Sequence, residues 1–326
     1  MPYCPNAFSG YFCLMTAEKQ EKVQPKTQKV YRQYNGTWDE IESEENPDTS
    51  SWKLTYDRVF TKDGELVSEI ELDVTGHEVQ KQLNTYNDKD KIVRHELYNE
   101  GQLAETIDFE YNEKGLLASE YREFEEGYPL RTLYTYDDEN RMIEKRVEDS
   151  DGEQEKRETY VYHDEWKEKV VRHEVHDEED TLTTEEVTEY ELRDGEVKVK
   201  TQTITDHTMN VLRKTVFYDA KGREDNIAYV TYNEKDKALE LYKIVYDEKG
   251  REAEERSESV LQSENFEIYS QYDDNDRIIH QEHRQGDRIL SKHNRRYNEQ
   301  GHANFHGFRS ASRGMHVDFV EYTYYS

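Results

Sequence analysis

The chain has 326 residues and a net charge of −30 at pH 7, because 74 Asp and Glu residues outnumber 44 Lys and Arg residues. A field of this sign repels nucleic acid and anionic membranes, which argues against both as partners, and it attracts basic proteins. Only 33% of the residues are hydrophobic, too few for a thick globular core, yet the 26 tyrosines are too many for a disordered chain. A thin sheet faced with Tyr, Val, Thr and Ile reconciles the two observations.

Residues 1–30 are expected to form an irregular leader. They contain Cys4 and Cys13, whose spacing does not match a zinc-binding pattern and whose disulfide would staple only the leader. The apolar stretch from Tyr11 to Met15 is too short for a signal peptide, and no stretch is long enough to span a bilayer. We therefore expect a cytoplasmic protein without membrane contact. A leader removed from the sequence would instead place the protein at the cell surface or in the periplasm.

Residues 31–326 are expected to form one continuous repeat domain. The repeat is an aromatic residue followed by Asp or Asn and, three positions after that, by Gly, Asn or Asp. Consecutive copies lie 25 to 28 residues apart, except for two steps of 14 residues after Tyr218. Clear copies begin at Tyr86, Tyr111, Tyr136, Tyr218, Tyr232, Tyr246, Tyr272 and Tyr297, and degenerate copies begin at Phe60, Tyr162 and Tyr190.

Each copy has the chemistry of a hairpin loop. Its Asp or Asn can accept hydrogen bonds from the backbone that follows, and its Gly, Asn or Asp tolerates a positive φ. Segments between copies alternate as strands do, for example Leu241–Tyr246. The sequence thus predicts an all-β fold, a long antiparallel meander of about twenty strands in a twisted or spiralling sheet or a partly closed shell. The edges near residues 56 and 322 are expected to pair with each other, with a second chain or with a partner strand.

The motif resembles the YD repeat of rearrangement-hotspot (RHS-type) proteins. Tyr218–Arg223 and Tyr246–Arg251 read Y-D-x-x-G-R in full, and the resemblance covers roughly residues 56–326. In that family such units build long β-sheets that can spiral into a hollow shell, so the resemblance implies a sheet of this kind. The chain is too short for a complete toxin-enclosing shell and shows no toxin-like C-terminal domain. The resemblance therefore implies a small stand-alone relative, which is a binding protein, an immunity protein or a surface protein.

No catalytic motif stands out, and paired carboxylates are too frequent to indicate acid–base chemistry. His280 and His283 are separated by an odd number of residues, which places them on opposite faces of a strand. His302 and His306 follow a turn and are weak candidates for a shared metal ion. The oxygen-rich loop Asp273–Asp276 is a weak calcium candidate beside the simpler interpretation of a solvated turn. We expect no cofactor.

The one locally basic loop, residues 307–314, contributes Arg309 and Arg313 as candidate partner-binding residues, and Tyr322 and Tyr324 are candidates because tyrosine is enriched at contact surfaces. The leading hypothesis is a non-catalytic acidic protein-binding module, most simply an immunity- or antitoxin-like protein that neutralises a basic toxin such as a nuclease. One alternative is an exported cell-surface or adhesive structural protein. Another is a metal-assisted enzyme that uses the late histidines.

Overall fold

The computed structural model describes residues 23–35, 38–41, 48–193, 196–206, 210–219, 221–231, 237–259, 265–312 and 314–325. Within these ranges the chain forms 22 strands and one helix of four residues, which confirms the all-β meander. In this part of the chain no helix is long and apolar enough to cross a membrane.

The strands follow one another with short connections. In chain order the elements are β1 (Pro25–Tyr34), α1 (Trp38–Ile41), β2 (Lys53–Phe60), β3 (Leu66–Leu72), β4 (Glu78–Tyr86), β5 (Ile92–Asn99), β6 (Gln102–Tyr111), β7 (Leu117–Phe124), β8 (Leu130–Tyr136), β9 (Met142–Glu148), β10 (Gln154–Tyr162), β11 (Val170–His176), β12 (Leu182–Arg193), β13 (Glu196–Asp206), β14 (Asn210–Tyr218), β15 (Glu224–Thr231), β16 (Lys237–Tyr246), β17 (Glu252–Ser259), β18 (Phe266–Tyr272), β19 (Ile278–Gln285), β20 (Arg288–Tyr297), β21 (Ala303–Ser310) and β22 (Gly314–Tyr324).

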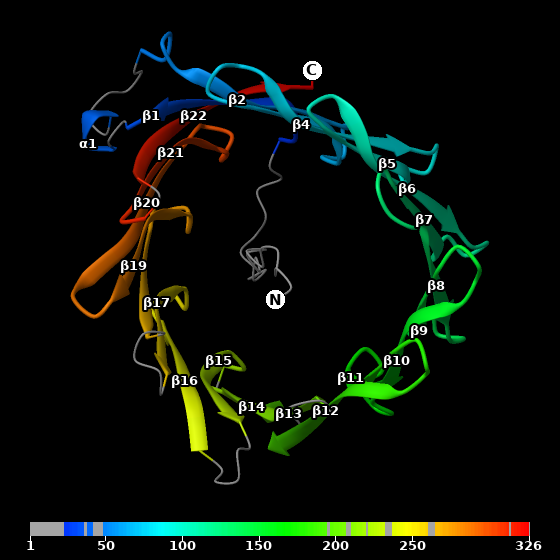
Figure 1. Ribbon diagram of the computed structural model, residues 1–326. Coiled ribbons are helices and arrows are strands. Elements are labelled where there is room, and N and C mark those ends of the chain that lie inside the picture. The colour runs from blue at the N-terminus through cyan, green and yellow to red at the C-terminus, as the bar shows by residue number, and fades with distance from the viewer. Residues whose placement is uncertain are drawn as a thin grey trace.

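Every strand pairs antiparallel with the next one in the chain, and β22 pairs with β1. The ladder therefore returns to its start, and Figure 1 shows the strands arranged as a ring. Strand β1 lies between β2 and β22. The segments near residues 56 and 322 are thus not edges, because β1 supplies a partner to each of them.

Strand β1 also corrects the expected leader. It begins at Pro25, so residues 25–30 belong to the sheet, whereas residues 1–22, with Cys4 and Cys13, lie outside the described residues. The burial of a β1 side chain shows why this segment belongs to the sheet. Val30 is buried between its neighbours in β2 and β22, because a strand in the middle of a ladder has a face that packs on both sides.

Alternate turns of a meander lie at the same end of the strands, so the ring has two rims. We call the rim with the turns that follow even-numbered strands the YD rim, because the repeat copies fall there, and the other the distal rim. Strand β15 ends at Thr231, on the distal rim, and the Tyr232 copy that follows it in the sequence lies outside the described residues.

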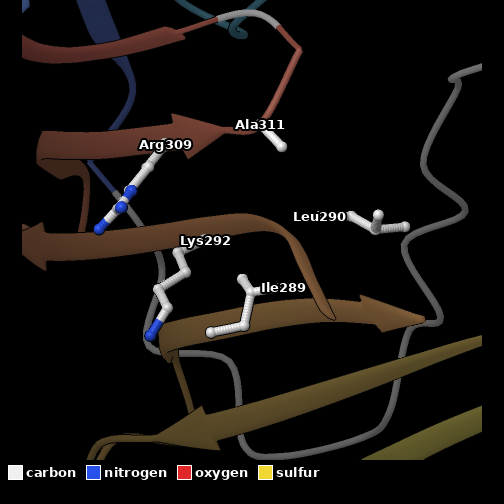
Figure 2. A pocket seen from close by; sticks show the side chains of 5 residues that line it. All are labelled: Ile289, Leu290, Lys292, Arg309 and Ala311. Atoms are coloured by element: carbon white, nitrogen blue, oxygen red, sulfur yellow. The ribbon is translucent and has the colours of Figure 1, made fainter. Parts of the chain in front are cut away.

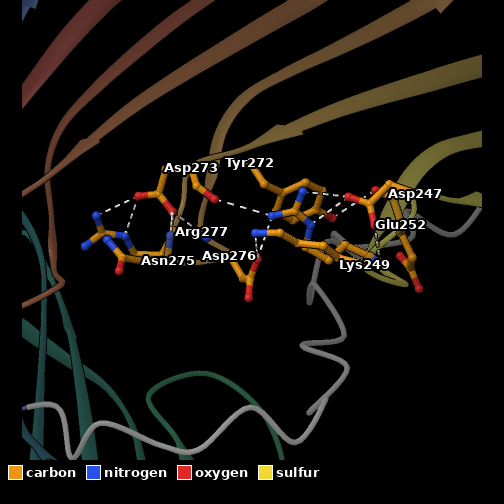
Figure 3. A network of polar contacts seen from close by, with 9 residues as sticks. Asp247, Lys249, Glu252, Tyr272, Asp273, Asn275, Asp276 and Arg277 are labelled. Atoms are coloured by element: carbon orange, nitrogen blue, oxygen red, sulfur yellow. Dashed lines mark hydrogen bonds and ion pairs between the residues drawn. The ribbon is translucent and has the colours of Figure 1, made fainter.

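The YD turns show why the motif has these residues. The Asp137 Oδ1 atom accepts hydrogen bonds from the backbone N–H groups of Glu139 and Arg141, at 2.9 Å each, and its Oδ2 accepts one from Arg141 Nε at 2.7 Å. Asn140 has a φ of 64°, in the left-handed region that Asn and Gly tolerate. Figure 3 shows the same arrangement at Asp247 and Asp273.

In most of the described copies the tyrosine joins one turn to the next along the YD rim. The Tyr111 hydroxyl donates to the carbonyl oxygen of Ile92 at 2.8 Å, and the Lys91 ammonium lies 4.9 Å from the Tyr111 ring centre. We call such a hydroxyl-to-carbonyl bond a tyrosine clamp. The same clamp, at 2.7–2.9 Å, is made by Tyr86, Tyr136, Tyr162, Tyr246, Tyr272, Tyr297 and Tyr322.

The apolar core is confined to one part of the ring. Among the described residues seven hydrophobic side chains are buried, and five of them belong to β1, β21, β22 and the segment entering β2. We call the four strands β1, β2, β21 and β22, with the segment that enters β2, the seam. The five are Val30, Trp52, Phe305, Val317 and Val320. The ring of Trp52 meets Phe305 edge-on at 6.4 Å, and the clamp from Tyr325 to the Phe60 carbonyl joins the two ends of the YD rim.

The outer and inner faces of the seam can be told apart through α1, which lies outside the ring in Figure 1. Trp38 of α1 packs on Gly307, where a Cβ atom would lie 2.7 Å from the indole. Gly307 therefore faces outward. Because side chains alternate along a strand, His306 and Phe308 of β21 face the interior of the ring.

Candidate functional site

Three neighbouring turns of the distal rim carry a dense group of carboxylates. They follow β7, β9 and β11, and strand pairing places them side by side. Within the described part of the chain, the members of this group are exposed and form no ion pair. We call the group the acidic arc, and it consists of Glu125, Glu126, Asp151, Glu153, Glu178 and Glu179.

The backbone of the acidic arc is fixed by local hydrogen bonds. Asp149 Oδ1 accepts from the N–H groups of Asp151 and Glu153 at 2.9 Å each, and Asp177 makes the matching bonds in the next turn. Arg157 pairs with Asp180 at 2.6 Å and holds the pKa of that carboxyl below its ordinary value. The exposed carboxylates therefore project from turns whose positions are set by the sheet.

A large aromatic side chain stands among these carboxylates. Tyr128 is 83% exposed, directly after Glu125, Glu126 and Gly127 in the turn between β7 and β8. The Gly127 φ of 136° is one that side-chain-bearing residues rarely adopt, so the turn requires glycine there. An exposed tyrosine ringed by charge is a common centre of protein–protein contact.

The strands β19–β21 and the turns between them have the opposite charge. Residues 277–313 contain eight Lys or Arg residues and three Asp or Glu residues, in a chain whose net charge is −30. On their outer face Lys292 lies opposite Arg309 in the β20–β21 register. Arg309, one of the predicted contact residues, is exposed there, and Arg313 lies outside the described residues.

Tyr322 and Tyr324, the other predicted contact residues, are both engaged within the ring. The Tyr322 hydroxyl makes the clamp to the Ala303 carbonyl and accepts from Gln28 Nε2 at 3.1 Å. Tyr324 accepts from Asn298 Nδ2 at 2.9 Å. Their contact with a partner stays a prediction, and the structure gives both a role in joining strands.

The two weak metal candidates have different neighbours. His302 Nδ1 lies 3.0 Å from the Tyr324 hydroxyl, whereas His306 Nε2 lies 3.1 Å from His293 Nδ1. Among the described residues no group of three or more His, Cys, Asp or Glu side chains is placed to hold a metal ion. At the calcium candidate, both carboxylate oxygens of Asp273 already accept hydrogen bonds: Oδ1 accepts from the Arg277 backbone N–H and Oδ2 accepts from Arg277 Nε.

A row of histidines across the inner face escaped the sequence analysis. His283, His293, His306 and His316 come from β19, β20, β21 and β22, and the His293 and His306 rings stack at 5.4 Å. Burial lowers the pKa of His293 and of His306 to about 4, and neighbouring His and Arg side chains add to the effect. The alternation within each strand shows which histidines share a face. Only the register between β20 and β21 shows that His293 and His306 are neighbours.

Comparisons with known proteins give no family. No family model matches the chain, and no curated protein matches it. A solved structure of TcdB2-TccC3-TEV is 11% identical with a TM-score of 0.30 and matches 83% of this chain, which spans 19% of that one. A porin-like protein from Bacteroides uniformis ATCC 8492 is 8% identical with a TM-score of 0.31, covering 92% and 98% of the two chains. One from Bacteroides vulgatus ATCC 8482 is 8% identical with a TM-score of 0.23, covering 92% and 99%. Similarity this low supports no functional argument, so the resemblance to YD repeats rests on the turn motif.

Proposed function

We propose that the protein is a non-catalytic binding module whose acidic arc binds a basic protein. The observation that carries this proposal is the exposed Tyr128 among unpaired carboxylates on three adjacent turns. Carboxylates that form no ion pair with the described residues are available to cations of a partner. Turns that a sheet holds in place lose little entropy when a partner binds.

Charge and aromatic area have different parts in such binding. The field of the acidic arc, added to a net charge of −30, steers a basic partner and raises the association rate, and salt weakens this effect. Tyr128 supplies apolar area that a partner can cover, which mainly slows dissociation. The expected complex therefore forms fast at low salt and keeps part of its affinity at high salt.

The YD-type turns suggest a more specific partner. Because this motif is typical of proteins from toxin systems, we propose a cytoplasmic immunity- or antitoxin-like role, in which the acidic arc covers the basic active-site surface of a toxin such as a nuclease. The acidic side of the ring would then mimic the nucleic acid that the toxin binds.

A low-salt pull-down from the native cell lysate, with bound proteins identified by mass spectrometry, tests the proposal. A five-site variant neutralises the arc with Glu125→Gln, Glu126→Gln, Glu153→Gln, Glu178→Gln and Glu179→Gln. The matched control removes the same charge from exposed carboxylates of the YD rim, with Asp88→Asn, Glu113→Gln, Asp138→Asn, Glu248→Gln and Asp274→Asn.

We expect one basic partner that the wild type and the control variant retain and that the arc variant loses. The single change Tyr128→Ala should raise the dissociation rate and leave the salt dependence unchanged. Equal loss of the partner from both five-site variants would mean that net charge alone is responsible. Retention of the partner by the arc variant, or an empty pull-down with the wild type, would overturn the proposal.

A further inference from the structure

A cavity of about 200 Å³ lies against β20 and β21, on the cationic side of the ring. Five residues line it: Ile289, Leu290, Lys292, Arg309 and Ala311. Figure 2 shows the two cationic side chains on one side of the cavity and Leu290 and Ala311 on the other. The cavity thus has a charged wall and an apolar wall.

The charged wall has one cation in excess. Lys292 pairs at 2.8 Å with Glu282, whose side chain is 6% exposed and which also pairs with Arg284. The Arg309 guanidinium forms no ion pair or hydrogen bond within the described part of the chain, although Arg309 lies directly across the ladder from Lys292. Like charges placed opposite each other on a sheet repel, so an anion between them is stabilised by both.

The apolar wall selects among anions. A carboxylate matches the two parallel donors of a guanidinium, and inorganic phosphate does so as well. Phosphate has nothing to place against Ile289, Leu290 and Ala311, whereas an alkyl chain would remove that surface from water. Each water occupies about 30 Å³ in the liquid, so the cavity has room for roughly six or seven non-hydrogen atoms.

We propose that this cavity binds a short-chain aliphatic carboxylate of about four or five carbons. Its carboxylate is held by Arg309, with Lys292 beside it, and its chain lies against Ile289, Leu290 and Ala311. The site lies on strands other than those of the acidic arc, and its occupancy is independent of the proposed partner.

Isothermal titration calorimetry of the full chain with sodium butyrate tests the site. For an open cavity of this size we expect saturable binding with a dissociation constant of about 1 mM. Butan-1-ol, which lacks the charge, and inorganic phosphate, which lacks the chain, should each bind at least about tenfold more weakly.

Arg309→Ala should remove butyrate binding, and the matched control Arg288→Ala, at an exposed neighbouring arginine, should leave it unchanged. Ala311→Leu fills the apolar side without altering charge and should weaken butyrate at least about tenfold while sparing phosphate. Circular dichroism of each variant confirms that the sheet is retained.

Three results would overturn the proposal. The first is an absence of saturable butyrate binding up to about 50 mM, a concentration far above the expected dissociation constant. The second is equal binding of butyrate and phosphate, which would make the site a nonspecific cationic surface. The third is undiminished butyrate binding by a folded Arg309→Ala variant.

Discussion

The seam and the wall formed by β3–β12 hold the same antiparallel ladder in different ways. In the seam Trp52, Phe305 and Val317 form a buried cluster with Tyr31, Trp38 and Phe319 packed against it. In the wall one hydrophobic side chain of the described residues, Ile107, is buried. The wall is instead joined by tyrosine clamps along the YD rim and by cross-strand ion pairs.

The difference follows from how far apart the partners are in the sequence. A clamp in the wall joins residues about 20 apart, such as Tyr111 and Ile92, so closing that loop costs little entropy. The pairing of β1 with β22 joins Val30 to Val320 across almost the whole chain. A closure of that length has no turn to support it, and the buried apolar cluster provides the free energy that it requires.

The largest expected effect is in the seam. Phe305→Ala should lower the free energy of unfolding by about 4 kcal/mol, because Phe305 is buried and loses contact with both Trp52 and Phe319. Urea denaturation followed by fluorescence measures the change. Val161→Ala in the wall, where the side chain is 51% exposed, is the control and should change stability little. Similar losses for both variants would remove the distinction between the regions.

The same substitution of an arginine should have unequal effects in the seam and at the YD rim. Arg32 pairs with Asp318 at 2.7 and 2.9 Å, and the Asp318 side chain is 9% exposed. Arg32→Gln leaves this carboxylate without its cation and should cost about 2 kcal/mol after allowance for solvent screening.

At the YD rim, Arg277→Gln removes the ion pair to Asp273 and the contact with the Tyr297 ring. This variant should cost about 0.5 kcal/mol, because both partners remain in contact with water. The two unfolding free energies, measured at low and at high salt, test the comparison. Equal costs, or a seam pair that is as salt-sensitive as the rim pair, would contradict it.

Acid should weaken the seam before it weakens the wall. Burial lowers the pKa of His306 to about 4, so between that value and the ordinary histidine pKa of about 6.5 the unfolded chain binds more protons. Stability therefore falls as the pH decreases from about 6.5 to about 4, by roughly 3 kcal/mol for this residue.

The histidine effect can be isolated by substitution. His306→Asn keeps a polar group beside His293 and should flatten the stability curve over this pH range. The same substitution at the exposed His77 is the control. A curve that is unchanged in the His306 variant would show that other groups control the acid response.

The smallest effect concerns a single clamp. Tyr111→Phe deprives the Ile92 carbonyl of its donor and should cost about 1 kcal/mol. Hydrogen exchange should show the loss of protection confined to β5–β7, since the repeat contacts are local. Loss of protection that spreads to β21 and β22 would mean that the wall is as cooperative as the seam.

The repeat could be predicted because its causes are local. The bonds from Asp137 to the turn backbone and the positive φ of Asn140 involve residues within one loop. The spacing of the tyrosines follows from a hairpin of fixed length. Strand number, the antiparallel meander and the half-steps around Tyr232 were therefore available from the sequence.

The candidate sites could be predicted only in part. The acidity of the chain was evident, and the exposure of Arg309 agrees with the choice of that residue, but the acidic arc and Tyr128 depend on which turns share a rim. His306 was paired with His302, whereas the structure places it against His293. The ladder between β20 and β21 contains a register shift between Arg296 and Tyr297. Counting along a single strand does not reveal this shift, so it does not show which histidines are neighbours.

The sequence by itself determined the turns, the strand period and the charge, because each depends on neighbouring residues. The tertiary structure decided that β1 joins β22, that Val317 is buried, and that two charged surfaces lie on different strands of one ring. The physical reason is that closure depends on the accumulated twist and register of all the strands. A local sequence pattern does not specify the accumulated twist and register. The residues that meet at the seam therefore become neighbours only when the ring is complete.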